Sequence, residues 1–141
     1  TAYEIRNCDW SSDVCSSDLS QNGTVYNLVK DKFRAWHAGQ GFWQEITDIN
    51  SISIGIELDY NPNGKNNKFS FKMIYSLKKL ILKLQKNFKI NKNGILAHSD
   101  VAPFRKIDPG KNFPWKSLLS SKSVLKFKNY STAFYQLNPR L

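Results

Sequence analysis

The stretch "SISIGIEL", residues 51–58, is the clearest strand signal in the chain. Large aliphatic side chains occupy every second position, and serine, glycine and glutamate fill the positions between them. Because successive side chains of a strand point to opposite faces, this pattern predicts one buried face and one face that carries a lone carboxylate. The aliphatic residues are Ile52, Ile54, Ile56 and Leu58, and the carboxylate is Glu57.

An amphipathic helix is predicted over residues 70–88, after this strand. Apolar residues recur there at helical spacing, lysines lie mostly on other faces, and Ser70 suits the N-cap position. The pattern is typical of a helix that packs on a sheet and keeps its lysines in solvent. A basic helix that binds a membrane or a partner groove is the alternative. The apolar positions are Ile74, Leu77, Leu80, Ile81, Leu84 and Phe88.

Three shorter segments complete the expected fold. Residues 24–29 follow a "QNG" turn and predict a strand, residues 61–68 predict a loop, and residues 94–98 predict a short buried strand that ends at His98. A sheet covered by a long helix indicates an α/β (α+β) fold, with a mixed β-sheet and chemically active residues at strand ends and in loops.

Composition limits the classes of protein that need to be considered. The 141 residues are 40% hydrophobic, enough for one domain with one core, and the net charge is +10. This charge, mostly from lysine, favours polyanionic partners such as nucleic acid, anionic lipid or bacterial cell wall. No nucleic-acid recognition motif accompanies it, so we expect no nucleic-acid partner. No apolar run is long enough to span a membrane, no secretory signal is visible at the start, and we expect a monomer.

Residues 1–19 differ in composition from the rest of the chain. They contain no lysine, four acidic residues and both cysteines, and they repeat "SSD". The phrase "CDWSSDVCSSDL" resembles a translated sequencing adapter, so we interpret residues 1–19 as a non-native segment. A flexible Ser/Asp-rich arm is the alternative. Cys8 and Cys15 therefore say nothing about the redox compartment. We expect a catalytic domain over residues 20–120 and a truncated C-terminal extension over residues 121–141.

A histidine and an aspartate near the end of the predicted domain suggest metal chemistry. His98 follows a predicted strand and Asp108 lies ten residues later, in a segment that Pro103 and Pro109 restrain. Imidazole nitrogen and carboxylate oxygen are both zinc ligands, so the pair is compatible with two corners of a zinc site. An ordinary hydrogen bond between the two side chains is the alternative. We expect Asp100 to be a structural cap or turn residue.

Five phrases, in this order, resemble the type 2 N-acetylmuramoyl-L-alanine amidase family. This family is related to peptidoglycan recognition proteins and to certain phage lysozymes. The resemblance covers roughly residues 20–118, and the last two phrases are most similar to the AmiD-like branch. The phrases are "NGTVYNLV" (22–29), "RAWHAG" (34–39), "NSISIGIEL" (50–58), "AHSDVAP" (97–103) and "RKIDPGKNFPW" (105–115).

The resemblance implies a zinc hydrolase that cuts the amide bond between N-acetylmuramic acid and L-alanine in peptidoglycan or muropeptides. It makes His98 and Asp108 ligands of a Zn²⁺ cofactor, Glu57 the catalytic carboxylate, and Lys106 the cation that supports the transition state. These residue types suit proton transfer and oxyanion stabilisation beside a metal ion. The substrate-binding residues that it implies are Trp36, His37, Asn50 and Arg105, and Trp115 is expected in the core.

One element of the family pattern is missing. The resemblance implies a third zinc ligand, a histidine in a phrase like "S-x-H-Y-L-I" about seven residues before Gly23, but no histidine precedes His37. We therefore expect the family's first strand to be missing or replaced, and activity to be impaired by the loss of one ligand. A non-catalytic peptidoglycan-binding module is the alternative function. The substrate implies the bacterial cell envelope or periplasm, with recycling in the cytoplasm as the alternative.

Overall fold

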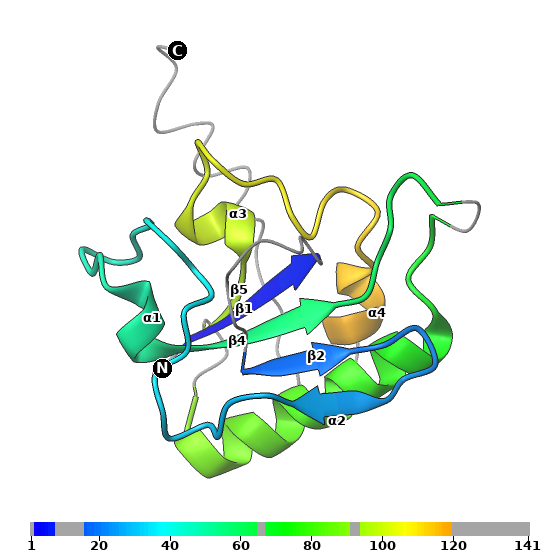
Figure 1. Ribbon diagram of the computed structural model, residues 1–141, viewed down its shortest axis with the longest axis horizontal. Helices are drawn as coiled ribbons and strands as arrows, with labels where there is room; N and C mark the ends of the chain where they lie inside the picture. The colour runs from blue at the N-terminus through cyan, green and yellow to red at the C-terminus, as the bar shows by residue number, and fades with distance from the viewer. Residues whose placement is uncertain (1, 8–15, 65–66, 91–93, 120–141) are drawn as a thin grey trace.

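The computed structural model describes residues 2–7, 16–64, 67–90 and 94–119. Within these ranges the chain forms a five-stranded sheet and four helices (Figure 1). The strands are β1 (Ala2–Asn7), β2 (Ser17–Leu19), β3 (Val25–Asn27), β4 (Ser53–Leu58) and β5 (Ile95–Ala97). The helices are α1 (Ile49–Ile52), α2 (Phe71–Phe88), α3 (His98–Val101) and α4 (Trp115–Leu119).

The strand order in the sheet is β3-β2-β4-β1-β5. Neighbouring strands are parallel except for the β2–β3 pair, which is antiparallel. The register pairs Ile5 of β1 with Ala97 of β5, and Arg6 of β1 with Glu57 of β4. Because β4 and β5 run in the same direction, their carboxyl ends meet at the same edge of the sheet.

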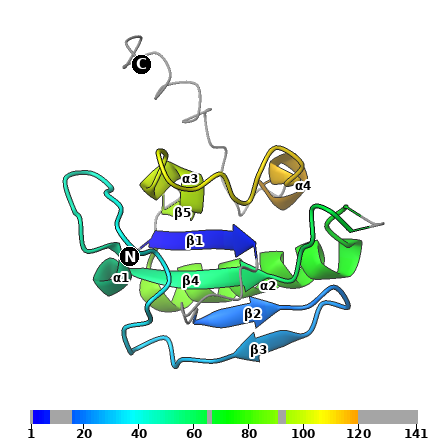
Figure 2. The same ribbon diagram turned by 45° about the horizontal axis from the view of Figure 1, so that its top comes forward.

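Helix α2 covers one face of the sheet, as its periodicity predicts (Figure 2). The Ser70 side chain caps its N-terminus and accepts a hydrogen bond from the Met73 backbone N–H at 3.0 Å, so the predicted cap is confirmed. The helix ends at Lys89, which adopts a left-handed conformation with φ of 53°. Its apolar stripe joins the aliphatic residues of β4 in the main core, with Phe113 and Leu118, and Trp115 packs against this core as expected.

A smaller core lies on the other face of the sheet. It contains Ala38, Ile49, Leu96 and Val101, all at most 2% exposed, and Trp43 and Ile52 pack against it. The short helices α1 and α3 contribute to this cluster, which therefore holds the segments before β4 and after β5 together. Both faces of β4 are consequently buried, and Glu57 is only 7% exposed.

The predicted α/β (α+β) class with a mixed sheet is confirmed, while several boundaries differ. Residues 49–52 form a helical turn, so the strand starts at Ser53. The last predicted strand ends at Ala97, because His98 begins α3. The first strand is not missing: Ala2–Asn7 forms β1 between β4 and β5. The proposed extension at 121–141 lies outside the described residues, and none of the described helices is long and apolar enough to cross a membrane.

Candidate functional site

The carboxyl ends of β4 and β5 bring two of the predicted residues to one edge of the sheet. Glu57 is the second-last residue of β4, and His98 follows β5 directly. One strand, β1, separates β4 from β5, so their backbones are about 10 Å apart at the usual strand spacing. Both side chains are withdrawn from solvent, with Glu57 7% and His98 0% exposed. This edge is the candidate active site.

The two predicted zinc ligands contact each other. The Nδ1 atom of His98 lies 3.0 Å from Oδ2 of Asp108, and Nε2 lies 3.1 Å from the backbone oxygen of Ala38. A carbonyl oxygen only accepts hydrogen bonds, so Nε2 carries a proton if this bond is formed. In a neutral imidazole the lone pair of Nδ1 then faces the carboxylate of Asp108. The Nδ1 lone pair and the Asp108 carboxylate could then bind the same cation. If Nδ1 is protonated instead, His98 and Asp108 form an ion pair.

Backbone hydrogen bonds order the segment that carries Asp108 and Lys106. The N–H groups of Arg105 and Lys106 both donate to the Ala102 carbonyl, at 3.0 and 2.9 Å, and Ser99 N–H donates to the Asp108 carbonyl at 3.1 Å. These bonds tie the turn that carries Lys106 to the end of α3, and they tie Asp108 to Ser99, the residue after His98. Lys106 is half-buried.

Asp100 has the structural role that the sequence predicts. Its Oδ2 accepts a hydrogen bond from the Ala97 backbone N–H at 2.8 Å, at the junction of β5 and α3. Burial raises the pKa of the Asp100 carboxyl above its ordinary value, and the hydrogen bond from Ala97 opposes this shift. Asp100 therefore orients the start of α3, where His98 lies, and it is not one of the predicted catalytic residues.

The donor set for a metal ion is incomplete among the described residues. His98 and Asp108 supply one nitrogen and one oxygen, whereas a catalytic zinc site usually has three protein ligands. No group of three or more His, Cys, Asp or Glu side chains in the described part of the chain is placed to hold a metal. The described residues thus fit two of the ligands and do not complete a zinc site.

The sheet order changes where a third ligand is expected. The position counted from the sequence is Ser16, next to β2, and β2 lies three strands from β5, roughly 14 Å away. The strand that borders β5 is β1. In the register, Ile5 pairs with Ala97, so Arg6 is the position beside His98. A ligand from the first segment would therefore come from the end of β1, where this chain has an arginine, which is not a usual zinc ligand.

His37 and Asn50, which the resemblance places in the substrate groove, are buried in this structure at 0% and 5% exposure. The Asn50 Oδ1 atom accepts hydrogen bonds from the backbone N–H groups of His37 and Ala38, at 3.0 and 2.8 Å. The His37 ring lies against the backbone of β4 at Gly55, with its Nε2 3.2 Å from the Ser53 hydroxyl. Both residues support the 37–38 segment, and direct substrate contact stays a prediction.

Trp36 and Arg105 are more accessible. The Trp36 side chain is 64% exposed, and the Arg34 guanidinium stacks on its ring at 4.4 Å while pairing with Asp48. Trp36 thus offers an ordered aromatic surface. The Arg105 Nη2 atom donates to the carbonyls of Ala38 and Gln40, both at 2.6 Å. Arg105 is therefore hydrogen-bonded to the backbone of this chain at two points, and the substrate contact that the family resemblance implies stays a prediction.

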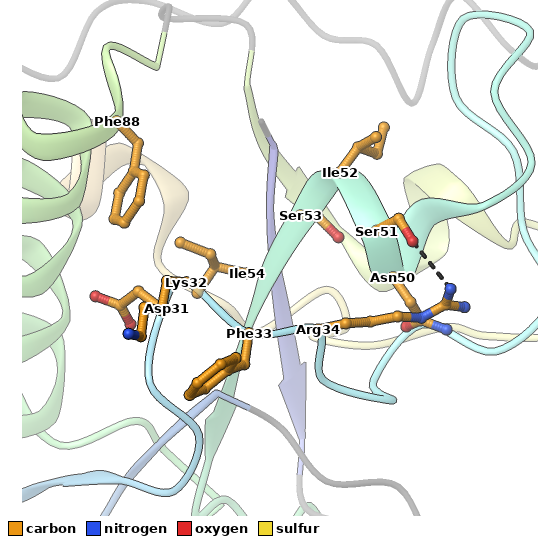
Figure 3. Close-up of a pocket in the computed structure, with 10 residues that line it drawn as sticks. All are labelled: Asp31, Lys32, Phe33, Arg34, Asn50, Ser51, Ile52, Ser53, Ile54 and Phe88. Atoms are coloured by element: carbon orange, nitrogen blue, oxygen red, sulfur yellow. Dashed lines mark hydrogen bonds between the residues drawn. The ribbon is translucent and has the colours of Figure 1, made fainter.

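A cavity of about 380 Å³ opens at the other end of β4 (Figure 3). The first residues of β4, Ser53 and Ile54, line it together with Phe33 and Phe88. Arg34 spans one side and donates to the Ser51 hydroxyl at 2.9 Å, as drawn in Figure 3. Glu57, His98, Lys106 and Asp108 do not line this cavity; Asn50 is the one predicted site residue that does.

Comparison with known proteins decides the family. The sequence profile described as N-acetylmuramoyl-L-alanine amidase (Amidase_2) matches residues 3–111. The chain belongs to the N-acetylmuramoyl-L-alanine amidase family. The 1,6-anhydro-N-acetylmuramyl-L-alanine amidase AmpD of Haemophilus influenzae is 39% identical over 105 residues, which are 73% of this chain and 55% of that protein. The N-acetylmuramoyl-L-alanine amidase AmiD of Escherichia coli is 36% identical over 100 residues, 67% of this chain and 36% of that protein.

The fold of this amidase-family chain matches solved structures of the same group. The AmiD complex from E. coli, solved with the substrate anhydro-N-acetylmuramic acid-L-Ala-D-gamma-Glu-L-Lys, aligns with a TM-score of 0.79 over 97% of this chain and 63% of that one. At 24% identity this alignment supports the fold alone. The chain spans about half or less of the two curated relatives, and the similar identities to AmpD and AmiD do not separate these two branches.

Three contributors to the site were missed at the sequence level. The Ala38 carbonyl is a backbone atom that no residue pattern reveals, and Ser53 contacts His37 only because the two segments fold together. The third contributor, Gly55, could have been predicted from the sequence. An isolated glycine inside a strand pattern often marks a close approach of another group, and a Cβ at this position would lie 2.4 Å from Cγ of His37.

Proposed function

We propose that this chain is the catalytic part of a zinc-dependent amidase that hydrolyses the bond between N-acetylmuramic acid and L-alanine in peptidoglycan or muropeptides. The observation that carries the proposal is the His98–Asp108 pair at 3.0 Å, held at the sheet edge that also carries Glu57. Family membership supports the same reaction. A mere binding module has little need for these groups together.

Glu57 and Lys106 take different parts in the proposed reaction. Glu57 accepts a proton from the attacking water and passes it to the nitrogen of the leaving L-alanine. Lys106 holds positive charge where the carbonyl oxygen becomes an oxyanion. A bound zinc ion, with His98 and Asp108 among its ligands, would polarise the scissile carbonyl and lower the pKa of water. In the same proposal, Trp36 lies along the stem peptide and His37, Asn50 and Arg105 line or support that groove.

Restoring the third ligand tests the proposal. Arg6→His places an imidazole at the β1 position beside His98, and Ser16→His places it at the position counted from the sequence. We expect Arg6→His to bind one zinc per chain and to release stem peptides from muropeptides. Ser16→His should do neither, and the unchanged chain should be impaired in both. Zinc content by atomic emission and peptide release by chromatography are the measurements.

Glu57→Gln in the Arg6→His background separates metal binding from catalysis. Zinc should remain bound while hydrolysis falls by at least about 100-fold, the scale expected when a general base is lost. If Arg6→His binds zinc and Glu57→Gln retains full activity, the assignment of Glu57 is wrong. If Arg6→His folds and neither binds zinc nor cleaves muropeptides, the catalytic proposal fails.

A non-catalytic peptidoglycan-binding module is the second candidate, because the described residues supply only two zinc ligands. Co-sedimentation with insoluble peptidoglycan distinguishes the two functions. A binding module would sediment with the polymer and release no stem peptide, even with zinc supplied. The substrate is compatible with an envelope or periplasmic location and also with cytoplasmic recycling of muropeptides.

We also infer that the sequence of residues 1–19 is foreign to the natural protein, whose own segment would supply β1 and β2 of the sheet, and that residues 20–120 form the rest of its catalytic domain. The compositional break at residue 20 and the adapter-like phrase support this inference. Sequencing the genomic region by long reads tests it. An unbroken reading frame with the same 19 codons would contradict it, whereas a histidine-bearing strand in their place would support it.

A further inference from the structure

We propose that the solvent-facing side of α2 docks on an anionic phospholipid bilayer through an aromatic pair and a row of lysines. The contact is peripheral, because the apolar side of α2 is buried in the main core and is not available to enter the membrane. The candidate active site takes no part in it. The inference therefore goes beyond the proposed function and does not depend on it.

One side of α2 carries aromatic and basic side chains together. At about 100° per residue, six exposed side chains fall within about 120° of the helix circumference, opposite the residues that face the core. No acidic residue occurs in α2, so no ion pair within the helix offsets these lysines. We call this surface the aromatic-lysine face, and its members are Phe71, Lys72, Tyr75, Lys79, Lys83 and Lys86.

The aromatic part of this face is exposed although it is apolar. Phe71 is 84% and Tyr75 is 51% exposed, and their rings are nearly parallel with centroids 6.3 Å apart. Lys79 Nζ lies 4.6 Å from the centroid of the Tyr75 ring. The three side chains thus form a continuous row along the helix. An exposed aromatic pair beside a row of lysines is typical of a surface that contacts a partner.

The chemistry of this face favours a bilayer among the polyanions that attract a basic protein. Four exposed lysines on one helix face match the basic clusters that bind anionic lipid headgroups. The bilayer interface also accepts aromatic rings at the level of the headgroups, while lysine stems reach from the same face to the phosphates. Charge and exposed rings are therefore both satisfied by one partner.

Docking through α2 leaves the candidate active site accessible. Helix α2 covers one face of the sheet, whereas α3, which begins with His98, lies on the other face with the smaller core (Figure 2). A bilayer against the aromatic-lysine face would lie on the side of the molecule away from His98. Membrane docking and substrate binding are consequently compatible.

Vesicle flotation of the full chain tests the proposal. The vesicles contain phosphatidylcholine alone or equal parts of phosphatidylcholine and phosphatidylglycerol, and we expect the chain to float only with the anionic ones. Lys79→Glu combined with Lys83→Glu should weaken this binding at least about tenfold, because each lysine near an anionic surface changes affinity roughly fivefold. Phe71→Ala combined with Tyr75→Ala should weaken it about 3–10-fold, since the rings enter only the headgroup region.

Matched variants outside α2 control for net charge and for aromatic content. Lys30→Glu combined with Lys111→Glu makes the same change in net charge at two exposed lysines away from the aromatic-lysine face, and should retain most of the binding. Phe104→Ala removes a ring that is 76% exposed in the loop after α3, and should match wild type. Circular dichroism and urea denaturation establish that each variant is folded. If the double aromatic variant is unstable, Phe71→Ala alone replaces it.

Three outcomes would overturn the proposal. The first is a wild-type chain that does not float with anionic vesicles. The second is equal weakening by the two lysine pairs, because net charge would then drive binding without a specific face. The third is an aromatic variant that keeps its vesicle binding and loses co-sedimentation with insoluble peptidoglycan, which would assign the face to the cell-wall polymer. None of these measurements requires hydrolysis, so the proposed amidase function and this inference fail separately.

Discussion

At the scale of single residues, close approach of backbone and side chain shapes the site. Gly55 lies in the middle of β4, and the His37 ring occupies the space where any larger residue would put its Cβ, 2.4 Å from Cγ of His37. Gly55→Ala must therefore displace His37 and the segment it supports. We expect a loss of about 1–3 kcal/mol in the free energy of unfolding, the usual cost of overpacking, measured by urea denaturation.

Gly64→Ala is the matched control for this substitution. Gly64 lies in the loop after β4, and a Cβ added there would have the Asn61 carbonyl oxygen as its nearest neighbour beyond adjacent residues, at 3.3 Å. Its effect should stay within about 0.5 kcal/mol. Equal losses at both glycines would mean that contact with His37 is not the cause.

The carboxyl of Asp18 should give stability a pH dependence of its own. Asp18 pairs in register with Glu57, and burial raises its pKa above the ordinary value of 3.8. The folded state then binds the proton more tightly than the unfolded state, so stability is lost as pH rises from 3.8 through the folded pKa. Asp18→Asn should be more stable than wild type at neutral pH.

The advantage of Asp18→Asn should shrink as the pH falls and vanish where both states of wild type are protonated. Urea denaturation of the two proteins at several values between about pH 3 and 7 measures the difference. If the stability difference between Asp18→Asn and wild type does not change with pH, burial of the charged Asp18 carboxylate is not its cause. The cost of burying that charge disappears when the carboxylate is protonated.

At the scale of elements, α2 depends on one capping side chain. Ser70 Oγ accepts a hydrogen bond from Met73 N–H at 3.0 Å and also donates to the Gln21 carbonyl, so it joins the helix to the β2–β3 turn. Ser70→Ala removes both bonds. We expect a loss of roughly 0.5–2 kcal/mol in the free energy of unfolding.

Ser70→Thr is the conservative control, because threonine keeps the hydroxyl and is a good N-cap residue. Thermal and urea denaturation of both variants should rank wild type and threonine together, with alanine below. If Ser70→Ala unfolds at the same urea concentration as wild type, the cap and its bond to Gln21 contribute nothing measurable to this fold.

At the scale of the whole molecule, the net charge of +10 should act on association with the proposed peptidoglycan substrate. Exposed lysines line α2, on the sheet face opposite the smaller core. They can attract an anionic polymer over a distance, and dissolved salt weakens this attraction. We expect binding to anionic peptidoglycan, measured by co-sedimentation, to weaken severalfold between about 0.05 and 0.5 M salt.

Lys79→Glu combined with Lys83→Glu tests whether this charge acts from a distance. Both positions are exposed on α2, away from His98 and Asp108. The double variant should bind polymer more weakly at low salt and match wild type at high salt. If neither salt nor these substitutions change the binding, recognition depends only on short-range contacts at the site.

Local sequence determined the elements whose signals come from neighbouring residues. The alternation of "SISIGIEL" and the helical spacing of residues 70–88 were sufficient for β4 and α2, and the serine before the helix marked its start. The ordered family phrases indicated the fold, and the resemblance implied the proposed roles of Glu57, His98 and Asp108. The predicted start of β4 at residue 51 was two residues too early, because Ser51 and Ile52 belong to α1.

The tertiary structure alone decided how these pieces meet. Sheet order put β1 between β4 and β5, which moved the expected third ligand from Ser16 to the position of Arg6. Folding also brought the Ala38 carbonyl to His98 and Arg105, 60 and 67 residues later in the chain. Periodicity and capping depend on residues a few positions apart, so sequence can reveal them. Contacts across such separations depend on which strands pair, and no local pattern encodes that choice.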